Sequence, residues 1–257
     1  MQMKLDKIRA KKCKEKIVML TAYDFQMAKL LDKTGIDLIL IGDSLGMVIM
    51  GQSNTKKVTM RDMLYHTEAV ARGAKQIPII GDMPINACST PSVAIRNAKA
   101  FINAGATSVK IEGYQPAVIK KLLSNSIPVM GHIGLLPQTA PKYLLVGTNK
   151  NDAKRILNDA KSLDKLGVFS IVLECIPSDL ARKITASVTA PTIGIGAGKY
   201  CDGQVLVIND LLGMDENFRP KFVKRYANLS VVIKQAVTKF KDEVRTGDFP
   251  NEEHSYI

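Results

Sequence analysis

The chain has little of what marks several common classes of protein. Its 257 residues include four cysteines, three histidines and no tryptophan, and no apolar run is long enough to span a bilayer. The cysteines are scattered and show no Cys-x-x-Cys pair or zinc spacing, which favours a reducing cytoplasm over a disulfide framework. The first sixteen residues are polar and rich in lysine, with no apolar segment behind them. We therefore expect no secretory signal, no membrane partner and a cytoplasmic location.

The net charge of +12 suggests two interpretations. A basic chain can bind nucleic acid, or it can simply present a solvated, lysine-rich surface. The lysines are spread over residues 4–16, 142–165 and 221–241, without interleaved aromatic residues or a known nucleic-acid-binding motif. This distribution favours the solvated surface, and we expect no nucleic-acid partner.

Six short apolar runs end beside an acid, a histidine or a glycine-rich turn. Runs of this length, bounded by turn residues, are typical of strands buried on both faces of a parallel sheet. Polar groups at the carboxyl ends of many such strands are how a (β/α)8 barrel builds an active site. The residues that close the runs are Gly42-Asp43-Ser44, Gly81-Asp82, Glu112-Gly113, Gly131-His132, Glu174-Cys175 and Gly194-Ile195-Gly196-Ala197-Gly198.

Strand and helix patterns alternate along the chain without a break in composition. This alternation predicts an α/β fold, a (β/α)8 TIM barrel in a single domain over residues 1–257, with an N-terminal helix. We expect an irregular loop at 46–57, an eighth strand at 205–209, and a long amphipathic helix at 220–246 followed by a polar tail. The gap between 198 and 205 is too short for a crossover helix.

Asp43 and Asp82 are the first candidate site. Two carboxylates at neighbouring strand ends, each preceded by glycine, can share a hard cation such as Mg²⁺ and leave positions for water and substrate oxygens. Each aspartate could equally cap the helix that follows it, a common role for Asp in βα loops. The residues alone leave both interpretations open.

Three further strand ends carry ionisable groups. Lys110 and Glu112 are two residues apart and point to the same face, where an inward pair is costly unless it is functional or forms a structural salt bridge. His132 is an acid/base candidate or a hydrogen-bonded core residue. Glu174 ends the most apolar strand, where burial would raise its pKa and suit it to proton transfer, with helix capping as the alternative.

Two other features attract a functional interpretation. Cys175 lies beside Glu174, but no histidine is close in sequence to activate it, so a packing thiol is favoured over a nucleophile. The glycines of 194–198 match only half of a dinucleotide fingerprint, and no ribose-binding acid follows. Close approach of the backbone to a substrate is the better interpretation of that segment.

Read together, these residues resemble the ketopantoate hydroxymethyltransferase family over almost the whole chain. Several ordered motifs carry the resemblance: Leu20-Thr21-Ala22-Tyr23-Asp24, Gly42-Asp43-Ser44-Leu45-Gly46-Met47, Tyr65-His66-Thr67, Val109-Lys110-Ile111-Glu112-Gly113, Pro128-Val129-Met130-Gly131-His132-Ile133-Gly134, Val172-Leu173-Glu174-Cys175-Ile176-Pro177, Cys201-Asp202-Gly203-Gln204-Val205-Leu206-Val207 and His254-Ser255-Tyr256.

The resemblance implies a Mg²⁺-dependent barrel enzyme of pantothenate, and so coenzyme A, biosynthesis. It implies transfer of a hydroxymethyl group from 5,10-methylenetetrahydrofolate to 3-methyl-2-oxobutanoate through a Mg-bound enolate, giving 2-dehydropantoate. It also implies a homo-oligomer, a homodecamer by family resemblance. The family pattern assigns the metal to Asp43, Asp82 and Glu112, substrate binding to Asp43, Ser44, Asp82, Lys110 and His132, and catalysis to Glu174.

One segment departs from that pattern. Position 136 is leucine where the family usually has threonine before the proline, and residues 135–147 read as a shortened loop. The residues that bind the folate are therefore not assigned.

Two other functions stay open. A lyase or mutase barrel related to isocitrate lyase would also use Mg²⁺ and a 2-oxo acid, although such enzymes usually have a cysteine-bearing catalytic loop that is not found here. A non-catalytic barrel that binds RNA or protein through its basic surface would show no metal dependence.

Overall fold

Eight parallel strands close into a barrel in which each strand pairs with its neighbours in sequence and β8 pairs with β1. The computed structural model describes residues 2–256. The strands are β1 (Ile17–Thr21), β2 (Leu38–Ile41), β3 (Ile79–Asp82), β4 (Ser108–Glu112), β5 (Val129–Gly134), β6 (Ser170–Glu174), β7 (Thr192–Ile195) and β8 (Gly203–Leu206). The predicted (β/α)8 barrel is confirmed.

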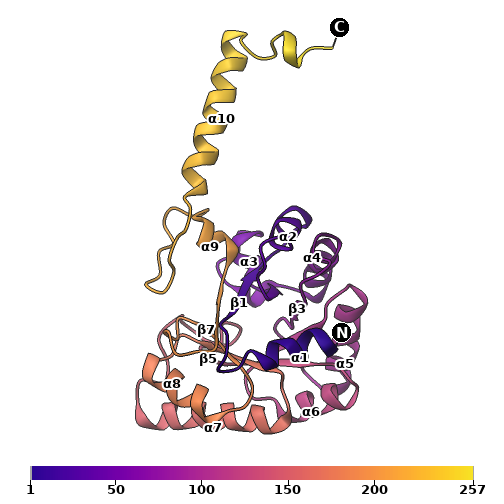
Figure 1. Cartoon of the computed structure of the whole chain (residues 1–257), viewed down its shortest axis with the longest axis vertical. Helices are drawn as coiled ribbons and strands as arrows, with labels where there is room; N and C mark the ends of the chain where they lie inside the picture. Colours follow the sequence, from indigo (N-terminus) through magenta and orange to yellow (C-terminus); the bar gives the residue numbers. More distant parts are fainter. Residues whose placement is uncertain (1, 257) are drawn as a thin grey trace. The chain divides into compact units, whose positions relative to one another are not determined.

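Helices cover the outside of the strands (Figure 1). They are α2 (Phe25–Leu31), α4 (Met60–Gly73), α5 (Pro91–Asn103), α6 (Pro116–Ser124), α7 (Lys150–Leu166) and α8 (Ser178–Ser187). Local signals set their boundaries. Thr59 and Asp62 form a capping box at the start of α4, and Gly167 ends α7 in the left-handed conformation. As predicted, no helix connects β7 to β8.

Glycines on the strands show which side chains point into the barrel. A Cβ on Gly81 of β3 would lie 2.3 Å from the ring of Phe101 on α5, and one on Gly131 of β5 would lie 2.9 Å from Leu163 on α7. These positions therefore face the helices. Because side chains alternate along a strand, the neighbours Asp82 and His132 face the interior.

The amino end of the barrel is filled with apolar side chains and covered by α1 (Gln2–Ala10). Leu5 and Ile8 of α1 belong to the same buried cluster as residues of the strands. Arg9 donates to the carbonyls of Gly167 and Val168, just before β6. This helix thus closes one end of the barrel and leaves the carboxyl end for the polar groups.

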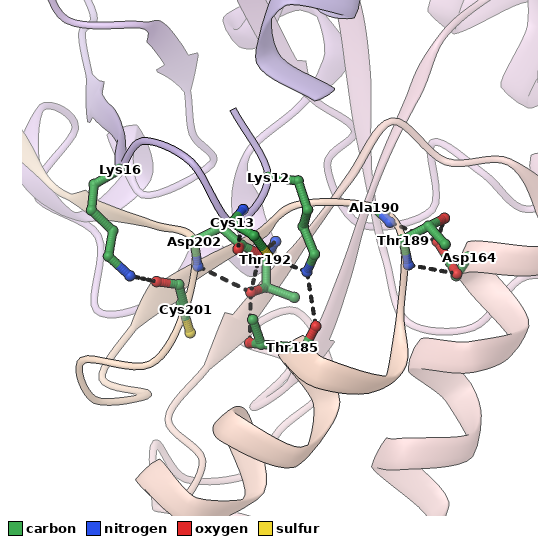
Figure 2. A network of polar contacts seen from close by, with 10 residues as sticks. All are labelled: Lys12, Cys13, Lys16, Asp164, Thr185, Thr189, Ala190, Thr192, Cys201 and Asp202. Carbon is green, nitrogen blue, oxygen red and sulfur yellow. Dashed lines mark hydrogen bonds and ion pairs between the residues drawn. The ribbon is translucent and has the colours of Figure 1, made fainter. Parts of the chain in front are cut away.

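A buried polar network joins β7, β8 and the segment after α1 at the amino end (Figure 2). Asp202, directly before β8, accepts hydrogen bonds from Lys12 Nζ and Thr192 N, each at 2.8 Å, and from Thr192 Oγ1 at 3.0 Å. Its Oδ1 accepts from the backbone N–H of Cys13 at 3.3 Å. One carboxylate therefore holds three segments where the barrel closes.

Three predicted boundaries were wrong. The expected loop at 46–57 contains α3 (Leu45–Val48) and a 3₁₀ turn, η1 (Thr55–Lys57), and β8 begins two residues earlier than expected, at Gly203. The final helix, α10 (Leu229–Thr246), starts later than residue 220. In the segment before it, the backbone N–H of Tyr226 donates to the carbonyl of Leu211 at 2.9 Å and not to that of Phe222, its partner in a helix.

The chain divides into two compact units, one up to Val207 and the other from Ile208 on. The second unit contains α9 (Ile208–Leu212), α10 and a short 3₁₀ turn, η2 (Glu252–His254). One side of α10 exposes large apolar residues, namely Ile233, Val237, Phe240 and Val244. In the part of the chain that the structure describes, no helix combines the length and apolarity needed to cross a membrane.

Candidate functional site

The ionisable residues predicted from the strand ends gather inside the carboxyl end of the barrel. Asp82 ends β3, Lys110 and Glu112 lie on β4, His132 lies on β5, and Glu174 ends β6. Neighbouring strands set these side chains beside one another, since Asp82 pairs in register with Lys110 and Glu112 with His132. Asp43, two residues after the end of β2, completes the group.

Asp43 and Asp82 form a buried pair and do not cap helices. They are 7% and 1% exposed, and the backbone N–H of Asp43 donates to Asp82 Oδ2 at 3.3 Å. The N-cap of α3 is Ser44, and that of α5 is Thr90. Burial raises the pKa of Asp43, and it raises the pKa of Asp82 to about 7. The capping interpretation of both aspartates is therefore wrong.

Lys110 is the buried cation of the site. Its Nζ lies 2.7 Å from Asp82 Oδ1 and 3.4 Å from His132 Nδ1. Burial alone would lower its pKa, but the carboxylates of Asp82, Asp43 and Glu112 outweigh burial and raise it. The ammonium is thus charged at neutral pH and faces the centre of the site, and the ion pair it forms is with Asp82.

Glu112 is buried on the same face of β4 as Lys110. Its Oε1 accepts the backbone N–H of Gln138 at 3.1 Å, and its Oε2 lies 3.8 Å from His132 Nδ1. Burial raises the pKa of Glu112 to about 8, against the lowering effect of Lys110. Three carboxylates, those of Asp43, Asp82 and Glu112, therefore share a single buried ammonium.

His132 connects this cluster to Glu174. His132 Nε2 lies 3.1 Å from Glu174 Oε2. Burial, assisted by Lys110, lowers the pKa of His132, which favours the neutral imidazole. Because an ammonium can only donate, a neutral ring that accepts from Lys110 at Nδ1 carries its proton on Nε2, the nitrogen that lies near Glu174.

Glu174 is less buried than its apolar strand suggested. Its side chain is 20% exposed, because it lies at the mouth of the barrel beyond the apolar part of β6. It does not cap α8, whose N-cap is Pro177. The arrangement gives Glu174 both a fixed partner in His132 and access to an incoming molecule.

Two residues of the site were missed by sequence reasoning. The hydroxyl of Tyr23 lies 2.8 Å from Ser44 Oγ and holds the predicted substrate-binding serine. The side-chain amide of Gln138 donates to Asp43 Oδ2 and to the carbonyl of Met83, each at 3.0 Å. Neither residue is ionisable at neutral pH, so neither drew attention as a strand-end charge.

The residues around Asp43 and Asp82 fit a divalent cation. Three buried carboxyl groups beside one ammonium have raised pKa values, because burial and mutual repulsion disfavour their ionised forms. A divalent cation would relieve that repulsion, and carboxylate oxygens are the ligands that Mg²⁺ prefers. Within residues 2–256, no group of three or more His, Cys, Asp or Glu side chains is arranged to hold an ion by itself. The predicted metal set of Asp43, Asp82 and Glu112 is therefore not arranged as a complete site in the described residues. Mg²⁺ usually takes one or two carboxylates and fills its remaining positions with water and substrate oxygens.

Other candidates from the sequence do not join the site. Burial raises the pKa of the Cys175 thiol to about 11, which leaves it protonated and a poor nucleophile at neutral pH. The glycines of 194–198 approach the chain itself, since a Cβ on Gly194 would meet Cys201 Sγ at 2.9 Å and one on Gly198 would meet Ser178 Oγ at 2.2 Å. Packing within the protein accounts for these two glycines.

A cavity of about 220 Å³ opens beside Glu112 and Gln138, lined also by Met83, Asn86, Ser89 and Gln115. Glu112 is the ionisable residue of the site that lines it, so the cavity lies to one side of the group.

Comparison with known proteins shows which family the sequence resembles. The sequence profile of the family described as "Ketopantoate hydroxymethyltransferase" matches residues 2–252. The 3-methyl-2-oxobutanoate hydroxymethyltransferase of Syntrophomonas wolfei is 51% identical over 96% of this chain and 92% of its own length. The enzyme of the same name from Caldicellulosiruptor saccharolyticus is 52% identical over 94% of each chain.

Solved structures of similar fold are more distant in sequence. A 2,3-dimethylmalate lyase of the PEP mutase/isocitrate lyase superfamily superimposes with a TM-score of 0.62 at 13% identity, over 98% of this chain and 92% of that one. A phosphonopyruvate hydrolase solved with oxalate and Mg²⁺ gives the same TM-score and identity over 98% and 93%. These likenesses concern the fold alone.

Proposed function

The chain belongs to the ketopantoate hydroxymethyltransferase family, and on that premise we propose that it makes 2-dehydropantoate from 3-methyl-2-oxobutanoate. It is a hydroxymethyltransferase, as its relatives' names indicate. The donor in our proposal is 5,10-methylenetetrahydrofolate, and the product would enter pantothenate synthesis. The observation that carries the proposal is the group of Asp43, Asp82, Lys110, His132 and Glu174 in one barrel mouth.

Asp43 and Asp82, with Glu112 behind them, would hold Mg²⁺. When bound, the ion supplies Lewis-acid polarisation of the oxo acid's carbonyl, which acidifies the neighbouring branched carbon. The pair is buried and already preorganised by the hydrogen bond from Asp43 N to Asp82. Little reorganisation is therefore needed when the oxo acid arrives.

Lys110 would offset the negative charge that develops when the substrate loses its proton. Its ammonium is fixed by Asp82 at 2.7 Å and lies in a buried environment, where a charge acts more strongly than in water. Ser44, held by Tyr23, would donate a hydrogen bond to the carboxylate of the oxo acid.

Glu174 would move protons while the one-carbon unit is transferred. It is the carboxylate of the group with access to solvent, and His132 Nε2 fixes its Oε2 at 3.1 Å. A neutral His132 can donate to Glu174 while it is ionised and so hold it ready to accept a proton.

We also propose a cytoplasmic homo-oligomer. The apolar side of α10, with Val237 60% and Phe240 54% exposed, is the kind of surface that a second copy covers. In the barrel unit, Ile49 and Met50 directly after α3 are also apolar and exposed. Light scattering at micromolar concentration should give a mass several times that of one chain, and a monomer would contradict this part of the proposal.

The lyase or mutase alternative rests on fold alone, because the barrels of that superfamily are only 13% identical to this chain. Relatives about half identical over nearly its whole length favour hydroxymethyl transfer. Binding of RNA by the basic surface would leave five ionisable groups converging in the barrel mouth without a role.

The test is a turnover assay with 3-methyl-2-oxobutanoate and methylenetetrahydrofolate labelled with ¹³C in its methylene group. We expect the label in the new hydroxymethyl group, loss of turnover on removal of divalent metal, and loss in Asp43→Asn and Asp82→Asn. Asp179→Asn, an exposed carboxylate on α8, is the matched control and should keep full activity. Full turnover in metal-free buffer, or no labelled product at all, would contradict the proposal.

A further inference from the structure

The loop between β5 and α7 is attached to the active site at both of its ends. The backbone N–H of Leu135 donates to the carbonyl of Glu174 at 2.8 Å, and that of Val146 donates to the carbonyl of Cys175 at 2.9 Å. Residues 135–146, here called the clasp loop, therefore start and end on the turn that carries the proposed proton-transfer residue.

Gln138 lies at the inner side of the clasp loop and contacts two carboxylates at once. Its backbone N–H donates to Glu112 Oε1 at 3.1 Å, and its amide Nε2 donates to Asp43 Oδ2 at 3.0 Å. The second amide proton goes to the carbonyl of Met83 at 3.0 Å. Both protons of the amide are thus used, and the residue is 7% exposed. A side chain held in this way has little freedom to turn.

The outer side of the clasp loop meets the segment that follows β2. Lys56 Nζ donates to the carbonyl of Ala140 at 3.3 Å. Burial raises the pKa of Tyr143 in the clasp loop, and hydrogen bonding to Thr55 of the same segment partly offsets this rise. Two loops from separate strand ends therefore meet above the carboxylates.

We infer that Gln138 is a positioning residue that couples closure of the clasp loop to binding of the divalent cation. This inference rests on the proposed function, because it needs a cation at Asp43 and Asp82. With Oδ2 of Asp43 and Oε1 of Glu112 held by one residue, the two carboxylates keep their orientation only while the loop is closed.

The coupling has two consequences. A cation that prefers the held carboxylates stabilises the closed loop, and by linkage the closed loop strengthens binding of the cation to the same degree. Removing the amide of Gln138 should weaken binding of the cation and destabilise the closed loop together. A merely structural glutamine would change stability and leave metal affinity as it was.

The test compares Gln138→Met with Gln115→Met. Methionine keeps the length of glutamine and the backbone N–H but removes the amide. Gln115 is the matched control, since its amide donates at 2.9 Å to the backbone carbonyl of Glu112 and touches no carboxylate. The probe is Mn²⁺, with free ion counted by electron paramagnetic resonance, and thermal unfolding checks the fold of each variant.

A second readout follows the loop directly. Lys142 is exposed in the clasp loop, and trypsin cleavage after it is followed by mass spectrometry with and without Mn²⁺. In the wild type we expect Mn²⁺ to slow this cleavage. In Gln138→Met we expect Mn²⁺ affinity to fall about 10- to 100-fold, the range typical of groups that orient metal ligands, and the protection at Lys142 to disappear. Gln115→Met should resemble the wild type in both.

Wild-type affinity for Mn²⁺ in Gln138→Met would overturn the inference and leave the proposed metal site intact. If the wild type itself bound no Mn²⁺, the metal site would fail and the inference with it. The wild-type cleavage experiment needs no variant, so absence of protection by bound Mn²⁺ would overturn the coupling even if Gln138→Met failed to fold.

Discussion

Asp202→Asn should destabilise the barrel at its amino end, far from the proposed chemistry. The Asp202 carboxylate is 5% exposed and accepts from Lys12, Cys13 and two groups of Thr192 (Figure 2). Asparagine keeps the shape but removes the charge and turns one acceptor into a donor. It also leaves Lys12, whose side chain is 15% exposed, without its counter-ion.

The size of the effect follows from these contacts. Breaking one side of a buried ion pair costs about 3–5 kcal/mol, and because Lys12 reaches solvent we expect a smaller cost, about 2–4 kcal/mol. For a chain of this size that corresponds to a fall in Tm of about 5–15 °C. Asp179→Asn removes an exposed carboxylate 3.2 Å from Arg182 and should cost under about 1 kcal/mol.

The assay is urea unfolding of both variants at several pH values. Burial would raise the pKa of Asp202, but hydrogen bonds from Lys12 and Thr192 outweigh it and hold the pKa below its usual range. A lowered folded pKa gives stability that is present above about pH 4 and is lost as the pH falls through the folded value. The free energy of unfolding of the wild type should therefore exceed that of Asp202→Asn at pH 7, and the two values should converge in acid. A difference under 1 kcal/mol at pH 7, or one that grows in acid, would refute the reasoning.

Two further predictions concern packing and substrate binding. Gly81→Ala would set a Cβ 2.3 Å from the ring of Phe101 and should cost about 1–3 kcal/mol of unfolding free energy by overpacking; an unchanged urea midpoint would contradict the assigned direction of β3. Tyr23→Phe removes the hydroxyl 2.8 Å from Ser44 Oγ, and loss of about 1 kcal/mol should raise KM for the oxo acid about fivefold with kcat nearly unchanged. An unaltered KM, or a loss confined to kcat, would exclude this role of Tyr23.

The strand-end residues were predictable because their geometry follows from topology. Parallel strands in a barrel end at one rim, so Asp43, Asp82, Lys110 and Glu174 had to lie near one another once the alternation was read correctly. The two-residue spacing of Lys110 and Glu112 placed both inside for the same reason.

Contacts between strands and loops could not be read from the chain. The pairing of His132 with Glu174 depends on barrel register, and the partner of Lys110 turned out to be Asp82 across the strand rather than Glu112 along it. Gln138 lies in a loop, and a loop has no hydrophobic periodicity from which its course could be predicted. The start of α10 was misplaced because the backbone N–H of Tyr226 donates to the carbonyl of distant Leu211, a contact that the apolar pattern does not reveal.

The most direct test of the account is the rate of hydroxymethyl transfer by Glu174→Gln with saturating Mg²⁺, oxo acid and methylenetetrahydrofolate. Glutamine keeps the size of the side chain and can still hydrogen-bond His132, while Asp43, Asp82 and Lys110 remain to bind metal and oxo acid. We predict that kcat falls about a hundredfold or more, while Tm and Mg²⁺ affinity stay near wild type. Turnover near the wild-type rate would contradict the assignment of Glu174 and make His132 the leading candidate for proton transfer.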